Sequence, residues 1–282
     1  MVNEGGGVLQ EMRAGLDAFA AAVAVVVPVA SVRDEVLDIG PGAPPVAVRR
    51  YRDADGALPV LVWFHGGGWV AGSLAAIDPT CRQLAVRAGV EVVSVSYPLA
   101  PESPFPAALS TCRAAVRTLR PAAVGGDSAG GNLAAVVAAT AAPGELAAQV
   151  LLCPLLDATG SSPSVAEKGV GQGLEAADLR RFAELYAGAA DLSDPLVSPL
   201  LAESFEWRPP AVVVTAEHDP LRDEGEAYAE RLRAAGVDVR ARRWAGTVHG
   251  FPGMTRETEA AAEALQWASE QLRELLGLPP ER

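Results

Sequence analysis

The sequence predicts an α/β fold with a mostly parallel sheet that carries helices on both faces. Short apolar runs typical of strands alternate with longer helical patterns over most of the chain. Residues 59–64, Pro-Val-Leu-Val-Trp-Phe, form a continuous apolar run, which is typical of a strand buried on both faces. With 282 residues, one large domain with a small lid is more economical than two independent domains.

The N-terminal part of the chain is predicted to begin with a helix over residues 8–27 that stops before Pro28. Its apolar residues recur at helical spacing: Leu9, Met12, Leu16 and Phe19. We expect residues 1–30 to form an N-terminal lid helix. Residues 31–282 are then the main domain, which opens with a hairpin whose strands cover residues 31–39 and 46–51.

The remaining elements follow the alternating pattern, with one interruption. Further strands are expected at residues 59–64, 91–96, 122–127, 149–153, 211–216 and 237–244. Helices are expected at residues 77–88, 106–119, 128–142, 174–186, 220–235 and 255–276. Residues 160–190 break the rhythm with glycine-rich loops around the 174–186 helix. An insertion of this kind over the strand ends is a second lid segment.

Composition excludes several classes of function. A formal net charge of -12 argues against binding to nucleic acid or to anionic membranes, because phosphate contacts need clustered Lys and Arg. Three widely spaced cysteines form no Cys-x-x-Cys pair, so neither a disulfide framework nor a metal site is expected. The apolar run at residues 18–27 is too short to span a bilayer and follows acidic residues, so we expect a cytoplasmic protein.

The pentapeptide Gly126-Asp127-Ser128-Ala129-Gly130 lies at a predicted strand-to-helix corner and matches the nucleophile-elbow pattern. The turn is sharp enough that strand and helix nearly touch, which requires glycine on either side of a strained serine. The helix amides at such a corner stabilise a developing oxyanion. The alternative is a glycine-rich turn with an incidental serine, because so short a match also arises by chance.

A second glycine cluster, His65-Gly66-Gly67-Gly68-Trp69, follows the buried strand at residues 59–64. Glycine lets the backbone approach a ligand closely with its amides free. We expect the amides of Gly67 and Gly68 to join that of Ala129 in an oxyanion hole, and Trp69 to contact the substrate. The alternative, a flexible surface loop, is disfavoured by the buried strand that leads into the glycines.

A catalytic serine needs a base and an acid. His249 follows the last strand and gives the order Ser, Asp, His that accompanies a nucleophile elbow. His65 is expected to order the glycine loop, and His218 to point away. Asp219 is the expected acid, although its position before a proline also suits a helix cap, and Asp223 is the alternative.

Five motifs together resemble those of the bacterial hormone-sensitive-lipase-like carboxylesterases. They are His65-Gly66-Gly67-Gly68-Trp69, Tyr97-Pro98-Leu99-Ala100-Pro101-Glu102 with Phe105-Pro106-Ala107, Gly126-Asp127-Ser128-Ala129-Gly130-Gly131-Asn132, Asp219-Pro220-Leu221-Arg222-Asp223-Glu224 and His249-Gly250-Phe251. The resemblance implies an α/β-hydrolase fold of eight strands. It also implies hydrolysis of short- to medium-chain acyl esters without a cofactor.

The chain departs from this family at three positions outside the expected triad and oxyanion hole. The family usually has arginine where Pro98 stands, histidine where Ile77 stands and tyrosine where Cys153 stands. The first thirty residues match the family poorly, which leaves the lid and the choice of substrate open.

We expect acyl transfer in which Ser128 attacks an ester carbonyl and His249 moves the proton. An amidase, or a deacetylase of a secondary metabolite, would use the same residues on a different substrate. A non-catalytic ligand-binding receptor on the same fold is a remote alternative, because such relatives lose the histidine that is present here.

The last strand, at residues 237–244, is expected at the sheet edge, where it could pair with a second copy of the chain. A two-fold axis at Val239 places Asp238 opposite Arg240 on both sides and so favours a homodimer. The alternative is that Arg240 and Arg242 guard the edge against pairing.

Overall fold

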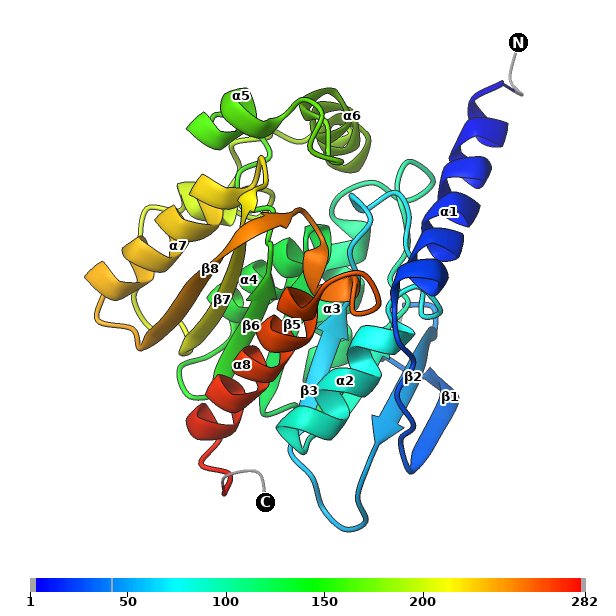
Figure 1. The fold of residues 1–282 in the computed structure, drawn as a ribbon, viewed down its shortest axis with the longest axis vertical. Helices are drawn as coiled ribbons and strands as arrows, with labels where there is room; N and C mark the ends of the chain where they lie inside the picture. Colours follow the sequence, from blue (N-terminus) through cyan, green and yellow to red (C-terminus); the bar gives the residue numbers. More distant parts are fainter. Residues whose placement is uncertain (1–3, 42, 280–282) are drawn as a thin grey trace.

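Figure 1 shows the computed structural model, which describes residues 4–41 and 43–279. Eight strands form one sheet in the order β1-β2-β4-β3-β5-β6-β7-β8. Their bounds are β1 (Ser31–Leu37), β2 (Val46–Arg52), β3 (Val60–Phe64), β4 (Glu91–Val95), β5 (Ala123–Asp127), β6 (Ala148–Leu152), β7 (Ala211–His218) and β8 (Val239–Val248). The strands β1, β2 and β4 pair antiparallel, and the pairings from β4 to β8 are parallel. The predicted fold class is confirmed.

The helices cover both faces of this sheet. They are α1 (Glu4–Val23), α2 (Asp78–Ala88), α3 (Ala107–Leu119), α4 (Ala129–Thr140), α5 (Pro163–Lys168), α6 (Ala176–Ala187), α7 (Arg222–Ala234) and α8 (Glu259–Leu275), with short 3₁₀ turns η1 (Pro199–Leu201) and η2 (Phe251–Gly253). One face packs against α2 and α8, and the other against α3, α4 and α7. In Figure 1, α5 and α6 lie beyond one end of the sheet, and α1 rises beside β2 toward the same end.

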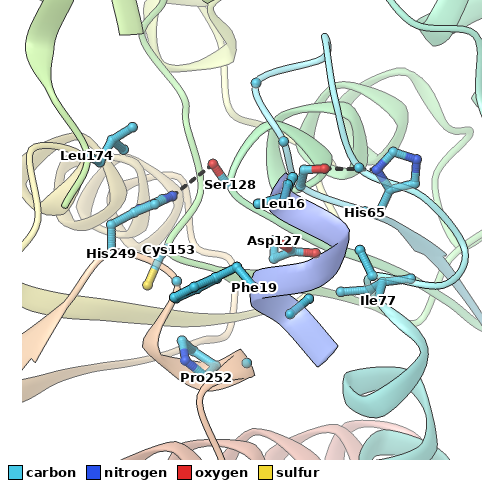
Figure 2. A pocket seen from close by; sticks show the side chains of 18 of the residues that line it. Leu16, Phe19, His65, Ile77, Asp127, Ser128, Cys153, Leu174, His249 and Pro252 are labelled. Carbon is cyan, nitrogen blue, oxygen red and sulfur yellow. Dashed lines mark hydrogen bonds between the residues drawn. The ribbon is translucent and has the colours of Figure 1, made fainter. Parts of the chain in front are cut away.

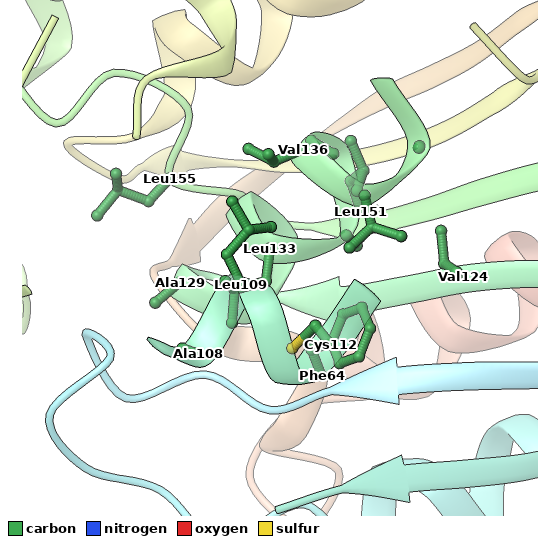
Figure 3. Close-up of a cluster of buried hydrophobic side chains, with 14 of the residues drawn as sticks. Phe64, Ala108, Leu109, Cys112, Val124, Ala129, Leu133, Val136, Leu151 and Leu155 are labelled. Carbon is green, nitrogen blue, oxygen red and sulfur yellow. The ribbon is translucent and has the colours of Figure 1, made fainter. Parts of the chain in front are cut away.

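The two cores are built from the apolar strands and the small residues of the helices. Figure 3 shows part of one core, where Leu109 and Cys112 of α3 and Leu133 of α4 gather around Phe64 at the end of β3. These side chains are at most 1% exposed. The close packing holds the ends of β3 and β5 firmly beside each other. All three cysteines are buried free thiols.

Helix α1 ends at Val23 rather than at residue 27, which corrects the predicted boundary. The β-branched residues Val25, Val26 and Val27 precede Pro28, and proline disfavours the helical conformation of the residue before it. The carbonyl of Val23 instead accepts the amide of Arg256, at 2.8 Å. The end of α1 is therefore attached to the segment that follows η2. No helix within the described residues is long and apolar enough to cross a membrane.

Strand β8 lies at the edge of the sheet, as expected, but it extends from Val239 to Val248. An axis at Val239 would therefore fall on its first residue. Arg240 already pairs with Asp238, at 3.0 Å, and with Glu274, at 2.9 Å, of its own chain. To pair with Asp238 of a second copy, Arg240 would have to give up these contacts within its own chain. The homodimer stays a prediction.

We expect a Val239→Cys variant to cross-link under mild oxidation, because opposed residues on the two-fold axis bring their Cα atoms within disulfide range. Non-reducing electrophoresis measures the cross-link, and light scattering at micromolar concentration measures the mass of the wild type. A monomeric wild type, or a proven dimer without the cross-link, contradicts this register.

Candidate active site

Ser128 stands at the corner between β5 and α4, with φ 52° and ψ -119°. Such a conformation is strained for a residue other than glycine. The surrounding backbone holds it: the Ser128 amide donates to the carbonyl of Leu152 at 2.9 Å, and the Ser128 carbonyl accepts the amides of Asn132 and Leu155, both at 3.1 Å. The predicted strand–serine–helix corner is present.

The glycines on either side of Ser128 have no room for a side chain. A Cβ atom on Gly130 would overlap the backbone carbonyl of Phe64, and one on Gly126 would overlap the backbone of Gly130. The first turn of α4 therefore presses directly against the end of β3. This contact brings Ser128 beside the loop that follows β3.

His249 joins Ser128 to Asp219. Its Nε2 lies 3.0 Å from the Oγ of Ser128, and its Nδ1 lies 2.9 Å from Oδ2 of Asp219. Asp219 is fully buried, and its Oδ1 accepts the amide of Leu221 at 2.8 Å. Asp219 therefore combines the two roles expected of it, that of the acid beside His249 and that of a cap before α7. One carboxylate oxygen binds His249, and the other binds the amide of Leu221 in the turn before α7. Asp223, the alternative acid, pairs with Arg222 instead.

The electrostatics of His249 favour its protonated form. Burial alone lowers the pKa of the imidazole, but the charge of Asp219 and its hydrogen bond outweigh burial, and Asp127 adds to the effect. The net pKa is raised above the ordinary value. An imidazolium formed when His249 takes a proton is thus stabilised in place.

The loop after β3 contains three successive residues with positive φ: Gly67 at 117°, Gly68 at 61° and Trp69 at 61°. The carbonyl of Gly67 accepts the amides of Val70, at 3.2 Å, and Ala71, at 2.9 Å, which closes the loop into a tight turn. Within the described residues, neither the Gly67 nor the Gly68 amide donates to another group of the chain. A Cβ atom on Gly68 would come within 2.5 Å of the Phe182 ring on α6.

The other two histidines occupy the places that the sequence predicts. His65 is 2% exposed, stacks on Tyr97 with ring centroids 4.3 Å apart, and donates from Nδ1 to the Gly66 carbonyl at 2.8 Å. Burial lowers the pKa of His65 to about 4, so the ring is neutral. His218 lies half-exposed beside Glu217.

An apolar cavity of about 540 Å³ opens onto Ser128 and His249. Figure 2 shows that Leu16 and Phe19 of α1, together with Ile77, Cys153, Leu174 and Pro252, surround the serine. The segments that line the cavity come from distant parts of the chain, including α1, α6 and the loops after β3, β5 and β8. Among the lining residues that the structure describes, Asp127 is the only Asp, Glu, Lys or Arg.

The chain is similar to known hydrolases. The alpha/beta hydrolase fold family matches residues 61–253. The chain is 41% identical over 234 residues to the esterase LipI of Mycobacterium tuberculosis (77% of this chain, 73% of the relative), and 41% identical over 250 residues to an ethyl acetate hydrolase of Pseudomonas putida (82% and 79%). The chain belongs to the α/β-hydrolase family.

Solved structures of esterases share the fold. A hyperthermophilic esterase from the archaeon Pyrobaculum calidifontis superposes with a TM-score of 0.89 at 36% identity, covering 95% of this chain and 94% of the other. The thermostable carboxylesterase EstE1, from a metagenomic library, gives 0.90 at 38% identity, covering 96% and 98%. The resemblance to hormone-sensitive-lipase-like carboxylesterases is confirmed, and so is the enzyme class, carboxylic ester hydrolase.

The expectation that Trp69 contacts substrate does not fit this α/β-hydrolase. Trp69 is fully buried, does not line the cavity, and stacks on Tyr186 of α6 with ring centroids 4.3 Å apart. It is the last of the three positive-φ residues, and its ring packs into the core beneath α6. Trp69 therefore anchors the glycine loop to the core and does not face the cavity.

Three residues near the serine, Asp127, Ile77 and Cys153, were not assigned a role from the sequence. Asp127 accepts the Trp63 Nε1–H at 3.2 Å and the amide of Gly66, and burial raises its pKa to about 6. Cys153 lines the cavity beside the triad, as does Ile77, so two of the three departures from the family pattern face the cavity. Only the departures themselves pointed to Ile77 and Cys153 in the sequence.

The donor atoms of Cys153, Asp219 and His249 lie within 4.8 Å of one another, which is the spacing of a possible metal site. The hydrogen bond between Asp219 and His249 already uses the Nδ1 position. Burial raises the pKa of the Cys153 thiol, which keeps it in the neutral form that binds metals poorly. We assign Asp219 and His249 to the proposed triad, and the expected absence of metal and cofactor stays a prediction.

We expect Gly130→Ala to destabilise the enzyme by about 1–3 kcal/mol or more, because its Cβ atom must displace the Phe64 carbonyl. Gly15→Ala is the matched control, since nothing lies within 4 Å of its Cβ position on α1. Alanine there should stabilise the helix by up to about 1 kcal/mol. Urea unfolding measures both; equal effects would contradict the close contact between β3 and α4.

Proposed function

We propose that this enzyme is a serine carboxylesterase that hydrolyses neutral esters with short- to medium-chain acyl groups through a Ser128–His249–Asp219 triad. The observation that supports this most directly is the continuous hydrogen-bonded path from the Ser128 hydroxyl through His249 to the buried Asp219. The path opens onto an apolar cavity large enough for a small ester.

In the acylation step, His249 Nε2 takes the proton of Ser128 as its Oγ attacks the ester carbonyl carbon. Asp219 fixes the tautomer by accepting a hydrogen bond from Nδ1–H, and its charge stabilises the imidazolium. His249 then protonates the leaving alcohol, and the acyl group remains on Ser128. In the deacylation step, His249 takes a proton from water as the water attacks the acyl carbon, and then returns a proton to the Ser128 Oγ as the acid is released.

The amides of Gly67, Gly68 and Ala129 are the proposed oxyanion hole. Ala129 is the first residue of α4, so its amide has no acceptor within the helix and lies at the positive end of the helix dipole. The amides of Gly67 and Gly68 are likewise not used by the described chain. Each such donor typically contributes a few kcal/mol to the transition state.

We assign the roles of lids to α1, within residues 1–30, and to α6, within the 160–190 insertion. Both supply apolar walls to the cavity: Leu16 and Phe19 from α1, and Leu179 and Phe182 from α6. A cavity of limited volume suits a short acyl chain better than a long one. The lack of Lys or Arg among its described lining residues favours neutral substrates.

Two other functions remain open to the same site. An amidase or deacetylase would use the same residues, and only assays with both ester and amide substrates separate these activities. A non-catalytic receptor is disfavoured because His249 is present and bonded to both partners. We further propose a cytoplasmic protein that binds no nucleic acid.

The Ser128→Ala variant tests the nucleophile. We expect hydrolysis of p-nitrophenyl butyrate to fall by several orders of magnitude while circular dichroism stays unchanged, because the variant lacks the hydroxyl that is hydrogen-bonded to His249. His218→Ala is the control and should retain activity. A Ser128→Ala variant with more than about a tenth of the wild-type rate would exclude the assignment.

The pH dependence tests the base. His249 must be neutral to take the proton, so kcat/KM should fall as the pH drops through the raised pKa of His249. The midpoint should lie above the ordinary imidazole value of about 6.5. Asp219, Asp127 and the Cys153 thiol are the other titratable groups around the ring. His218→Ala should leave the acid limb in place, and loss of that limb would show that the base is the other histidine.

Acyl length and charge test the cavity. Among p-nitrophenyl esters, chains of about four to eight carbons should give the highest kcat/KM. A hemisuccinate should be hydrolysed more slowly than a butyrate, because the described lining offers no cation to bind its carboxylate. Fastest hydrolysis of emulsified long-chain triglycerides would contradict the proposed cavity.

A further inference from the structure

Arg13, in the middle of the lid helix α1, uses its whole guanidinium group to hold two loops of the main domain. Its Nε donates to the carbonyl of Val70 at 2.7 Å, and its Nη2 to the carbonyl of Ala100 at 3.1 Å. Nη1 and Nη2 also donate to the two carboxylate oxygens of Glu102, both at 2.8 Å. A fork of this kind fixes direction as well as distance.

The Val70 carbonyl belongs to the tight turn that presents the proposed oxyanion amides. The amide of Val70 donates to the carbonyl of Gly67 at 3.2 Å. Gly67 therefore binds the N–H of Val70, and Arg13 binds its carbonyl. The amide of Ala100 donates to the Trp69 carbonyl at 3.0 Å. Both carbonyls held by Arg13 are thus joined to the run of positive-φ residues, in which Trp69 adopts a conformation that is unfavourable for a residue other than glycine.

A second polar contact from α1 reaches the same segment. Asp17, one turn after Arg13, accepts the Ser73 hydroxyl at 2.8 Å, and the Ser73 Oγ accepts the amide of Ala76 at 3.0 Å. The apolar residues Leu16 and Phe19 of the same helix face the cavity. Helix α1 therefore lines the cavity and also binds the segment that follows the proposed oxyanion glycines.

The ion pair itself contributes little stability. The Glu102 side chain is 60% exposed, and exposed pairs are worth about 0–1 kcal/mol. The Arg13 hydrogen bond lowers the pKa of Glu102 to about 2, so the pair is charged at every pH at which the enzyme would work. The inference therefore rests on the two carbonyl contacts of Arg13 and not on its ion pair with Glu102.

We propose that Arg13 is a positioning residue for the oxyanion loop, so that docking of α1 over the cavity also sets the geometry of residues 66–71. This inference rests on the proposed function. Helix α1 then covers the cavity and also positions the Gly67 and Gly68 amides that stabilise the transition state. The expected effect of losing Arg13 falls on kcat, because oxyanion stabilisation is stronger in the transition state than in the bound substrate.

Kinetics on p-nitrophenyl butyrate separate the two roles of α1. Arg13→Ala should lower kcat by about 10–100-fold with little change in KM, since a small misplacement of catalytic groups costs about that much. Phe19→Ala, which only removes cavity wall, should mainly raise KM. Glu102→Gln keeps both carbonyl contacts of Arg13 and should change kcat by less than about threefold.

Controls guard against a general loss of structure. Arg233→Ala on α7 removes a comparable exposed ion pair, with Glu230, and should leave kcat unchanged. Arg13→Lys, which keeps a cation on the same helix, should recover part of the lost kcat. If Arg13→Ala fails to fold, the Arg13→Lys value of kcat still decides between the two roles.

Hydrogen exchange measures the coupling without any substrate. In Arg13→Ala, the hydrogen-bonded amides of residues 66–71, which are those of Gly66, Val70 and Ala71, should exchange faster than in the wild type, while those of α7 stay unchanged. A wild type without esterase activity would refute the proposed function, and hydrogen exchange would still test the coupling. The inference is overturned if Arg13→Ala raises KM at unchanged kcat, or if exchange in residues 66–71 is unaltered.

Discussion

The contact between the first turn of α4 and the end of β3 is the constraint on which the site depends. Gly130 lies so close to the Phe64 carbonyl that no side chain fits between them. Because the helix approaches this closely, Ser128 and Ala129 stand directly beside the loop of Gly67 and Gly68. The close packing of backbone against backbone therefore brings the proposed nucleophile beside the proposed oxyanion donors.

The sheet order supplies the other half of the site. Strands β5, β6, β7 and β8 are successive neighbours, so the loops after β5, β7 and β8 lie at one end of adjacent strands. Asp219 and His249 leave β7 and β8 at that end, and the irregularity in pairing between Ala216 and His218 falls just before Asp219. Burial of Asp219 then makes its charge effective on His249. Chain order and parallel pairing together explain why residues so distant in sequence form one hydrogen-bonded path.

The sequence predicted what depends on local backbone chemistry. The glycines around Ser128 are needed for a sharp turn, and the glycine loop follows the end of a strand. The order of Ser128, Asp219 and His249 follows from the successive strand ends. The sequence did not predict side-chain direction where tertiary packing decides it. The Trp69 ring lies in the core, stacked on Tyr186, and α1 ends before the valines that precede Pro28. The cavity walls and Arg13 could not be foreseen, since they depend on how α1 docks onto segments far away in the chain.

The most direct measurement of the central claim is intact and peptide mass spectrometry after reaction with a p-nitrophenyl phosphonate ester. The account predicts one phosphonyl group per chain, attached to Ser128, because only this hydroxyl is hydrogen-bonded to His249 within the described site. Asp219→Asn should slow the labelling strongly, since the imidazole loses the partner that fixes its tautomer. Labelling of another residue, or equal labelling of a Ser128→Ala variant, would contradict the account.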